Sequence, residues 1–135
     1  ISGPLLDRID IHIEVTPVPF EKLSDDQKAE SSVDIRKRVT AAREIQTERF
    51  EQMEHIHYNA QMNTKHIREY CALDDVSKQL LKTAMERLNL SARAYDRILK
   101  VARTIADLDA APIVVSSHIA EAIQYRSLDR DGWLG

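Results

Sequence analysis

Repeated helix signals constrain this sequence more than any other feature. At several points a short polar residue stands in front of apolar residues that recur at the three- and four-residue spacing of a helix face. The strongest case begins at Ser91, a favourable N-cap, and its apolar residues are Tyr95, Ile98, Leu99, Ala102, Ile105 and Ala106. This spacing predicts a helix from Ser91 to about Leu108 with one buried face.

Four further segments carry the same combination of cap and apolar spacing. They are residues 31–53, 63–71 and 74–89 and, after Pro112, a last helix that reaches Tyr125. The predicted N-caps are Ser31, Asn63 or Thr64, Asp74 or Asp75, and Ser116 or Ser117, and Asn89 fits a helix C-terminus. With 3 Gly and 4 Pro, the chain lacks the turn residues that a β-sandwich or barrel needs. The predicted fold is therefore mainly α, a bundle of four to five helices.

The helix predicted at 31–53 has two different faces. Its apolar residues recur at helical spacing and are expected to be buried: Ile35, Val39, Ala42 and Ile45. Its other face is charged and carries Arg36, Lys37, Arg38, Arg43, Glu44, Glu48 and Arg49. The basic members of that face are a weak candidate for contact with DNA, and a solvated helix surface is the commoner outcome.

Residues 9–15 break the helical pattern. Here the apolar residues Ile9, Ile11, Ile13 and Val15 alternate with polar ones, a period of two that is typical of a half-buried strand. Because a lone strand leaves its backbone groups without partners, we expect its sheet to lie upstream, outside this chain. The segment is then expected to pair between chains or to fold back on the helices.

These patterns divide the chain into three parts. Residues 1–19 are expected to be the end of a core domain, residues 20–30 a linker, and residues 31–135 a helical domain. The abrupt start without an initiator Met suggests a piece of a longer protein.

Charge and cysteine content narrow the functional classes. A net charge of −3 gives no bulk electrostatic reason to bind nucleic acid or an anionic membrane. The single cysteine, Cys71, excludes an internal disulfide and fits a reducing compartment. Together with His55, His57 and His66 it does not supply four ligands at defined spacing, so no metal site is expected. No apolar run approaches the roughly 20 residues of a membrane span, and we expect a cytoplasmic protein.

One candidate functional residue is Arg8, directly before the predicted strand. An arginine on a turn beside a sheet edge can reach a neighbouring subunit, where its guanidinium can stabilise charge on a transferring γ-phosphate. The alternative is a surface ion pair with Asp7 or Asp10, which is the commoner role of such a residue.

A second candidate is Arg93, in the first turn of the helix that Ser91 caps. A cation is slightly unfavourable at a helix N-terminus, by about 0.3–1 kcal/mol, and an anionic ligand would reverse that effect. Arg97 and Lys100 share the same face. The alternative is a solvated stripe whose charges are balanced by Asp96 and Asp107.

Three segments resemble a known family. Residues 3–10, GPLLDRID, resemble the segment that closes the AAA+ core in magnesium-chelatase I subunits and MCM helicases. Residues 90–108, LSARAYDRILKVARTIADL, are similar to the lid of bacterial magnesium-chelatase-like AAA+ ATPases, and residues 118–130, HIAEAIQYRSLDR, to the end of the same domain. The resemblance covers essentially the whole chain and is weakest at residues 20–29.

This resemblance implies a fold and roles for three residues. The helical part would be the AAA+ lid, and the orphan strand would be the last strand of the AAA+ core. Arg8 would be the arginine finger, which acts in trans on the neighbouring subunit. Arg93 would be sensor 2, which contacts the γ-phosphate of ATP, and Arg97 is an additional candidate with less support.

The resemblance also implies a motor. The full-length protein would use ATP and Mg²⁺ and assemble from its own subunits into a homo-hexameric ring. A DNA-processing role is favoured, as a branch-migration helicase in natural transformation. The segments that bind ATP are not in this sequence, so we expect the chain alone neither to hydrolyse ATP nor to bind it tightly.

Two other interpretations stay open. The motor could serve a metal chelatase and act on a metallation partner instead of DNA. The chain could also be a helical protein-interaction module of a protein without ATPase activity.

Overall fold

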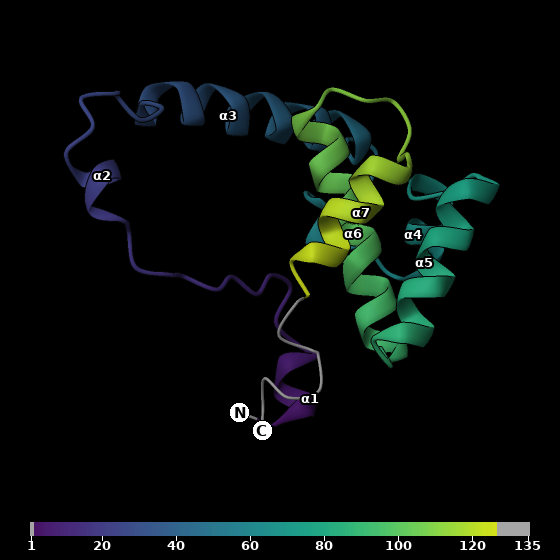
Figure 1. Cartoon of the computed structure of the whole chain (residues 1–135). Helices are drawn as coiled ribbons and strands as arrows, with labels where there is room; N and C mark the ends of the chain where they lie inside the picture. Colours follow the sequence, from purple (N-terminus) through teal and green to yellow (C-terminus); the bar gives the residue numbers. More distant parts are fainter. Residues whose placement is uncertain (1, 127–135) are drawn as a thin grey trace.

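The computed structural model describes residues 2–126, and these form seven α-helices and one 3₁₀ helix (Figure 1). They are α1 (Gly3–Leu6), α2 (Phe20–Leu23), α3 (Ser32–Arg49), η1 (Asn59–Gln61), α4 (Thr64–Tyr70), α5 (Asp75–Arg87), α6 (Ala92–Leu108) and α7 (Ser116–Gln124). The expectation of a mainly α fold is confirmed, and α3 to α7 are the five helices of the bundle. None of the described helices is both long and apolar enough to cross a bilayer.

Most helices begin at the predicted caps. In α3, α4, α5 and α6 the side chain of the N-cap accepts a hydrogen bond from the backbone N–H three residues later, and these N-caps are Ser31, Asn63, Asp74 and Ser91. Each such cap satisfies an N–H that the helix itself leaves without a partner. The last helix differs from the prediction, because α7 begins after Val115, whose N–H donates to Nδ1 of His118 at 3.0 Å.

Two helices end in a left-handed residue. Asn89 has φ 49°, and the N–H of Leu90 then reaches back to the carbonyl of Met85, which ends α5 as predicted. The same arrangement ends α6, where Ala110 has φ 52° and the N–H of Ala111 donates to Ala106. This geometry satisfies carbonyls that would otherwise lack partners at the helix end.

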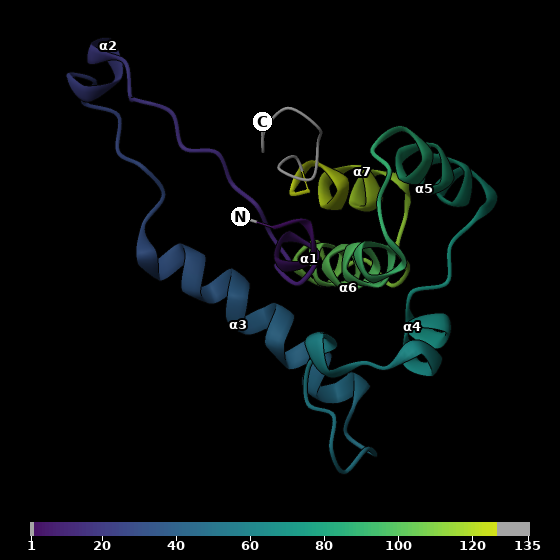
Figure 2. The ribbon, with the colours of Figure 1, turned by 90° about the horizontal axis from the view of Figure 1, so that it is seen from below.

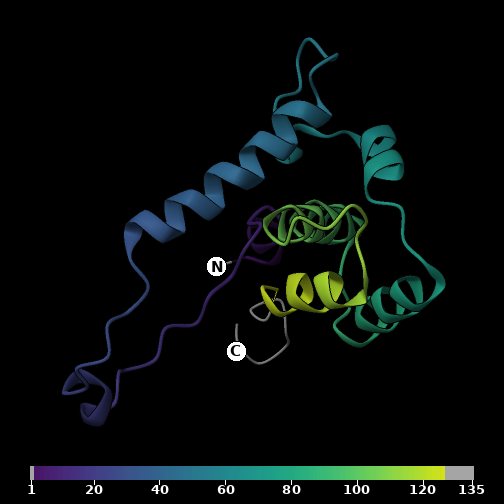
Figure 3. The ribbon, with the colours of Figure 1, turned by 90° about the horizontal axis from the view of Figure 1, so that it is seen from above.

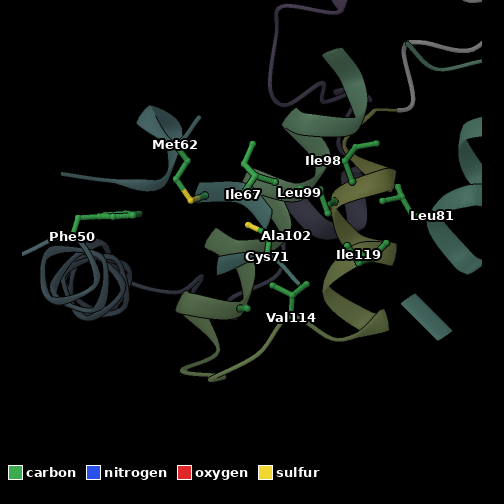
Figure 4. Packing of buried hydrophobic residues seen from close by; sticks show 12 residues of the cluster. Phe50, Met62, Ile67, Cys71, Leu81, Ile98, Leu99, Ala102, Val114 and Ile119 are labelled. Atoms are coloured by element: carbon green, nitrogen blue, oxygen red, sulfur yellow. The ribbon is translucent and has the colours of Figure 1, made fainter. Parts of the chain in front are cut away.

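Helix α6 lies at the centre of the bundle (Figures 1 and 2). It contacts α3, α4 and α7, and α5 packs against α7. The buried apolar core gathers around it: Phe50, Met62, Ile67, Cys71, Leu81, Ile98, Leu99, Ala102, Ala106, Val114, Ile119 and Ala122 (Figure 4). Full burial of a side chain such as Ile98 or Ile119 contributes about 1.5–3 kcal/mol.

The prediction of a strand at residues 9–15 is wrong. No strand occurs among residues 2–126, and this segment is extended chain without a ladder. Its apolar side chains are exposed, from 38% at Ile9 to 88% at Val15, while His12 on the opposite side is 4% exposed. With no second strand beside it, the alternation has no sheet in which to bury its apolar face.

The first half of residues 9–15 folds back on the helices, which was one of the two expected outcomes. The N–H of His12 donates to the carbonyl of Tyr125 at 2.6 Å. Asp10, Ile11 and Ile13 line a hollow of about 390 Å³ together with residues of α6 and α7.

Helix α3 is supported along only part of its length. It ends at Arg49 instead of about Met53, and residues 32–41 are all exposed. Ile35 and Val39, predicted to be buried, are 41% and 46% exposed. Figures 2 and 3 show this half of the helix running away from α6 and α7. The apolar spacing is real, but nothing in the described chain covers it.

A buried polar network joins the C-terminal half of α3 to α6. Asp107 is completely buried and accepts hydrogen bonds from Arg49, Asn59 and Arg103. The backbone N–H of Asn59 in turn donates to the side chain of Gln46 at 2.9 Å. Arg49 was expected on the charged face of its helix, and the alternative for Arg93 used Asp107 as a partner of a solvated stripe. Both residues instead belong to this buried network.

Candidate functional site

Arg93 lies on the first turn of α6 with its side chain exposed. The turn is built by Ser91, whose hydroxyl accepts from the N–H of Ala94 at 3.2 Å. No acidic residue occurs in this first turn, and within residues 2–126 Arg93 has no ion pair. A guanidinium in this position offers five N–H donors to an anion beside a helix end of positive potential.

Arg97, one turn further along α6, already has an ion-pair partner. Its guanidinium forms an ion pair with Asp10, and the Arg97 side chain is 30% exposed. Lys100, the next basic residue on this face, donates to the carbonyl of Ala60 at 3.1 Å. Among residues 2–126, the predicted basic stripe therefore divides into one arginine without an ion pair, Arg93, and two cations that bind other parts of the chain, Arg97 and Lys100.

Arg8 lies on the turn that follows α1, and its side chain is exposed. The N–H of Arg8 donates to Leu5 at 3.0 Å, and the N–H of Ile9 donates to Leu6 at 3.1 Å, so the backbone of this turn is closed on itself. Neither predicted surface partner, Asp7 or Asp10, pairs with Arg8 in the described structure. Asp10 is used by Arg97 instead.

The Asp10–Arg97 ion pair joins the segment that follows the Arg8 turn to α6, although the two residues are 87 positions apart. No described contact joins Arg8 to Arg93.

Arg126 was not singled out from the sequence. It lies just after α7, is completely buried, and donates from its guanidinium to the carbonyls of Leu6 and Ile9. Only proximity in the fold reveals it, because a residue that binds backbone carbonyls more than 100 positions away leaves no local pattern.

The described chain offers cations but no metal ligands in a group. No cluster of three or more His, Cys, Asp or Glu side chains that could hold an ion occurs among residues 2–126. A hollow of about 400 Å³ lies between α4, α5 and the first half of α6, and its lining includes Arg68, Lys78 and Asp96. The exposed guanidinium groups of Arg8 and Arg93 are able to bind anions.

Comparison with known proteins decides the family. The family described as "Magnesium chelatase, subunit ChlI C-terminal" matches residues 29–126, which include α3 to α7. The chain belongs to this magnesium-chelatase C-terminal family. The expected resemblance is confirmed.

Individual relatives agree with the magnesium-chelatase assignment. The chain is 43% identical over 131 residues to competence protein ComM of Haemophilus influenzae and 40% identical to the uncharacterized protein YifB of Escherichia coli. It is 31% identical over 126 residues to the uncharacterized protein Rv2897c of Mycobacterium tuberculosis. These alignments cover 96% of this chain for the first two and 93% for the third. The chain spans about a quarter (25%) of the length of each of these curated relatives.

Proposed function

We propose that this chain is the lid of a magnesium-chelatase-like AAA+ ATPase that processes DNA. The observation that carries the proposal is Arg93 on the first turn of the central helix, an exposed arginine that has no carboxylate partner within residues 2–126, in a chain of this family. An unpaired cation at a helix N-terminus is slightly unfavourable unless an anion is bound there. The γ-phosphate of ATP would be that anion, which gives Arg93 the role of sensor 2.

The second part of the proposal concerns Arg8. Its exposed side chain stands on a closed turn away from Arg93, a position that suits a finger directed at another subunit. There it would stabilise negative charge that develops as the γ-phosphate is transferred. The ring would be a homo-hexamer, so each subunit would supply one Arg8 to its neighbour.

Arg97 is a weaker candidate than Arg93 for a contact with the nucleotide. It lies on the face of α6 that carries Arg93, but it is already paired with Asp10. A phosphate would have to compete with that carboxylate, so Arg97 is the weaker candidate for a nucleotide contact.

ATP with Mg²⁺, bound by the core domain of the full-length protein, would supply the phosphoryl transfer that drives the motor. The residues of this chain fit such a group as cations only, because the described part holds no cluster of metal ligands. The segments that bind ATP are not in this sequence, so the chain alone is proposed to be inactive as an ATPase.

The DNA-directed role rests on the relative named competence protein ComM, which is 43% identical to this chain. Competence is the ability to take up DNA, so this name favours a DNA-directed motor, and a branch-migration motor is the form of it that we propose. The exposed basic residues of α3, among them Arg36, Lys37 and Arg43, are available for a DNA backbone in such a motor.

The experiment measures ATP hydrolysis by the full-length protein with and without forked DNA. Arg8→Ala and Arg93→Ala are compared with wild type and with Arg87→Ala, an exposed arginine at the end of α5. Loss of the finger is expected to lower DNA-stimulated turnover by a factor on the order of 10³. Arg93→Ala is expected to abolish stimulation, whereas Arg87→Ala should leave it unchanged. Full activity in both test variants would refute the two assigned roles.

A second candidate is the motor subunit of a metal chelatase, because the matched family is described by a magnesium-chelatase subunit. The same assay separates the two functions. A chelatase motor is expected to hydrolyse ATP without stimulation by forked DNA and to respond to its metallation partner instead. A protein-interaction module would show no ATP hydrolysis in any of these conditions.

A further inference from the structure

The turn that carries Arg8 is bound by Arg126, a residue more than 100 positions later in the sequence. Arg126 donates through Nη2 to the carbonyl of Leu6 at 3.3 Å and through Nη1 to the carbonyl of Ile9. These two carbonyls lie on either side of Arg8. One planar guanidinium therefore spans the base of the turn, since its donors diverge in a fixed fork.

A second residue closes the same turn. The ring Nε2 of His12 lies 3.2 Å from the carbonyl of Leu6, and the backbone N–H of His12 donates to Tyr125 at the end of α7. His12 and Leu6 are 4% and 2% exposed, so the base of the turn is buried while Arg8 itself is exposed.

The buried position of Arg126 requires an explanation. A completely buried guanidinium is costly unless its donors are satisfied. Arg126 meets part of this demand with carbonyls of the Arg8 turn, which comes from the opposite end of the sequence. An apolar side chain at position 126 could also pack α7 against residues 6–9, and it would avoid the cost of a buried charge. It could not fix the direction of the Leu6 and Ile9 carbonyls, which the guanidinium does.

We propose that Arg126 is a positioning residue for Arg8, and that it fixes the turn from which the Arg8 side chain projects toward its target. This inference rests on the proposed role of Arg8 as an arginine finger. Arg126 itself would touch neither nucleotide nor reacting atoms. Its removal is expected to impair turnover without weakening nucleotide binding, because the bound nucleotide would lie on another subunit.

The first measurement examines the turn directly in this chain. Hydrogen exchange is compared between wild type, Arg126→Met and Arg87→Met. In Arg126→Met the amides of Arg8, Ile9 and His12 are expected to exchange at least tenfold faster, a size typical of local opening. The amides of α6 should keep their protection in both variants. Unchanged exchange at residues 8–12 would overturn the positioning role, and so would loss of protection throughout α6.

The second measurement examines turnover in the full-length protein. Arg126→Met is expected to lower kcat by about 10²-fold, the effect of a small misplacement of a catalytic group, with KM for ATP unchanged. Arg126→Lys, which keeps the charge but not the fork, should restore part of the loss. Arg87→Met serves as the matched control and should retain full turnover.

Mixed rings separate positioning from a general structural role. Arg126→Met subunits are combined with subunits that have an intact Arg8 but lack the ATP-binding lysine of the core domain. Recovery of hydrolysis in the mixture is expected, since the intact Arg8 would act on the sound nucleotide site of the Arg126→Met subunit. No recovery, or wild-type kcat in Arg126→Met alone, would overturn the inference. Full activity of Arg8→Ala would instead overturn the proposed function on which it rests.

Discussion

Arg49 and Asp107 meet through two parallel hydrogen bonds, of 2.8 and 2.6 Å, although 58 residues separate them in the sequence. The Asp107 carboxylate is completely buried, and Arg103 approaches it from the preceding turn of α6 at 3.1 Å. A single buried carboxylate thus balances two arginines where α3 crosses α6. Such fork-shaped pairs combine a strong interaction with a fixed geometry.

Removal of the buried carboxylate is expected to destabilise the fold. Asp107→Asn keeps the shape of the side chain but leaves Arg49 and Arg103 without a counter-charge. Burial already lowers the pKa of the Arg103 guanidinium, and Asp107 opposes that shift. Breaking a buried pair in this way is expected to cost about 3–5 kcal/mol in the free energy of unfolding, measured with urea. Asp26→Asn in the exposed linker is the control, and a loss below about 1 kcal/mol in Asp107→Asn would contradict this account.

Alkaline pH is expected to weaken the fold through Cys71. Burial raises the pKa of its thiol from 9.0 to about 11, so the folded state holds the proton more tightly than the unfolded state does. The contribution of the thiol to stability is complete below pH 9 and falls as pH rises toward 11, by about 1 kcal/mol per pH unit. Cys71→Ala should remove this slope, and it should lower stability below pH 9, where the buried thiol of the wild type is protonated. Parallel stability curves for the two proteins from pH 8 to 11 would argue against it.

A glycine is expected to stabilise the end of α6. Ala110 has φ 52°, a left-handed conformation that is unfavourable for a residue with a Cβ atom. Ala110→Gly should therefore raise the free energy of unfolding by about 1 kcal/mol. The matched control is Ala120→Gly in the middle of α7, where glycine should lower it by about 1 kcal/mol. Thermal melting of the two variants should show shifts of opposite sign.

The pair between Arg97 and Asp10 is expected to matter little for stability. The two side chains are 30% and 50% exposed, and ion pairs of this kind contribute about 0–1 kcal/mol. Arg97→Met and Asp10→Asn should each change urea unfolding by less than about 1 kcal/mol. A larger loss would mean that the pair is part of the structural core. Within this limit, any change in ATP turnover of the full-length protein can be attributed to function.

Local signals predicted the helices well, because a cap or a helix end depends on residues only a few positions apart. Ser91 and Asn89 are examples, and both act as the sequence indicated. The extent of burial could not be predicted in the same way. The apolar spacing of α3 is genuine, but Ile35 depends on what lies beside it in space. The alternation at residues 9–15 failed for the same reason, since a strand exists only when a second strand pairs with it.

The same distinction between local signals and tertiary contacts applies to the candidate site. The sequence predicted an arginine on the first turn of α6, since Arg93 follows its cap by two positions. It could not predict that Arg97 pairs with Asp10, or that Arg126 holds the carbonyl of Ile9 across 117 residues. Those partners are chosen by tertiary packing, and no spacing rule connects them. The roles of Arg8, Arg93 and Arg97 stay predictions until turnover is measured.

Helix α3 has a mechanical consequence. Its C-terminal half is fixed at Asp107, whereas residues 32–41 extend free of the bundle for about 15 Å at 1.5 Å per residue. A change in the tilt of α3 would therefore pivot at the Arg49–Asp107 pair and be largest at the N-terminal end of the helix. Ser32 lies about 25 Å along the helix from Arg49, so a tilt of about 10° at this pair moves Ser32 by about 4 Å.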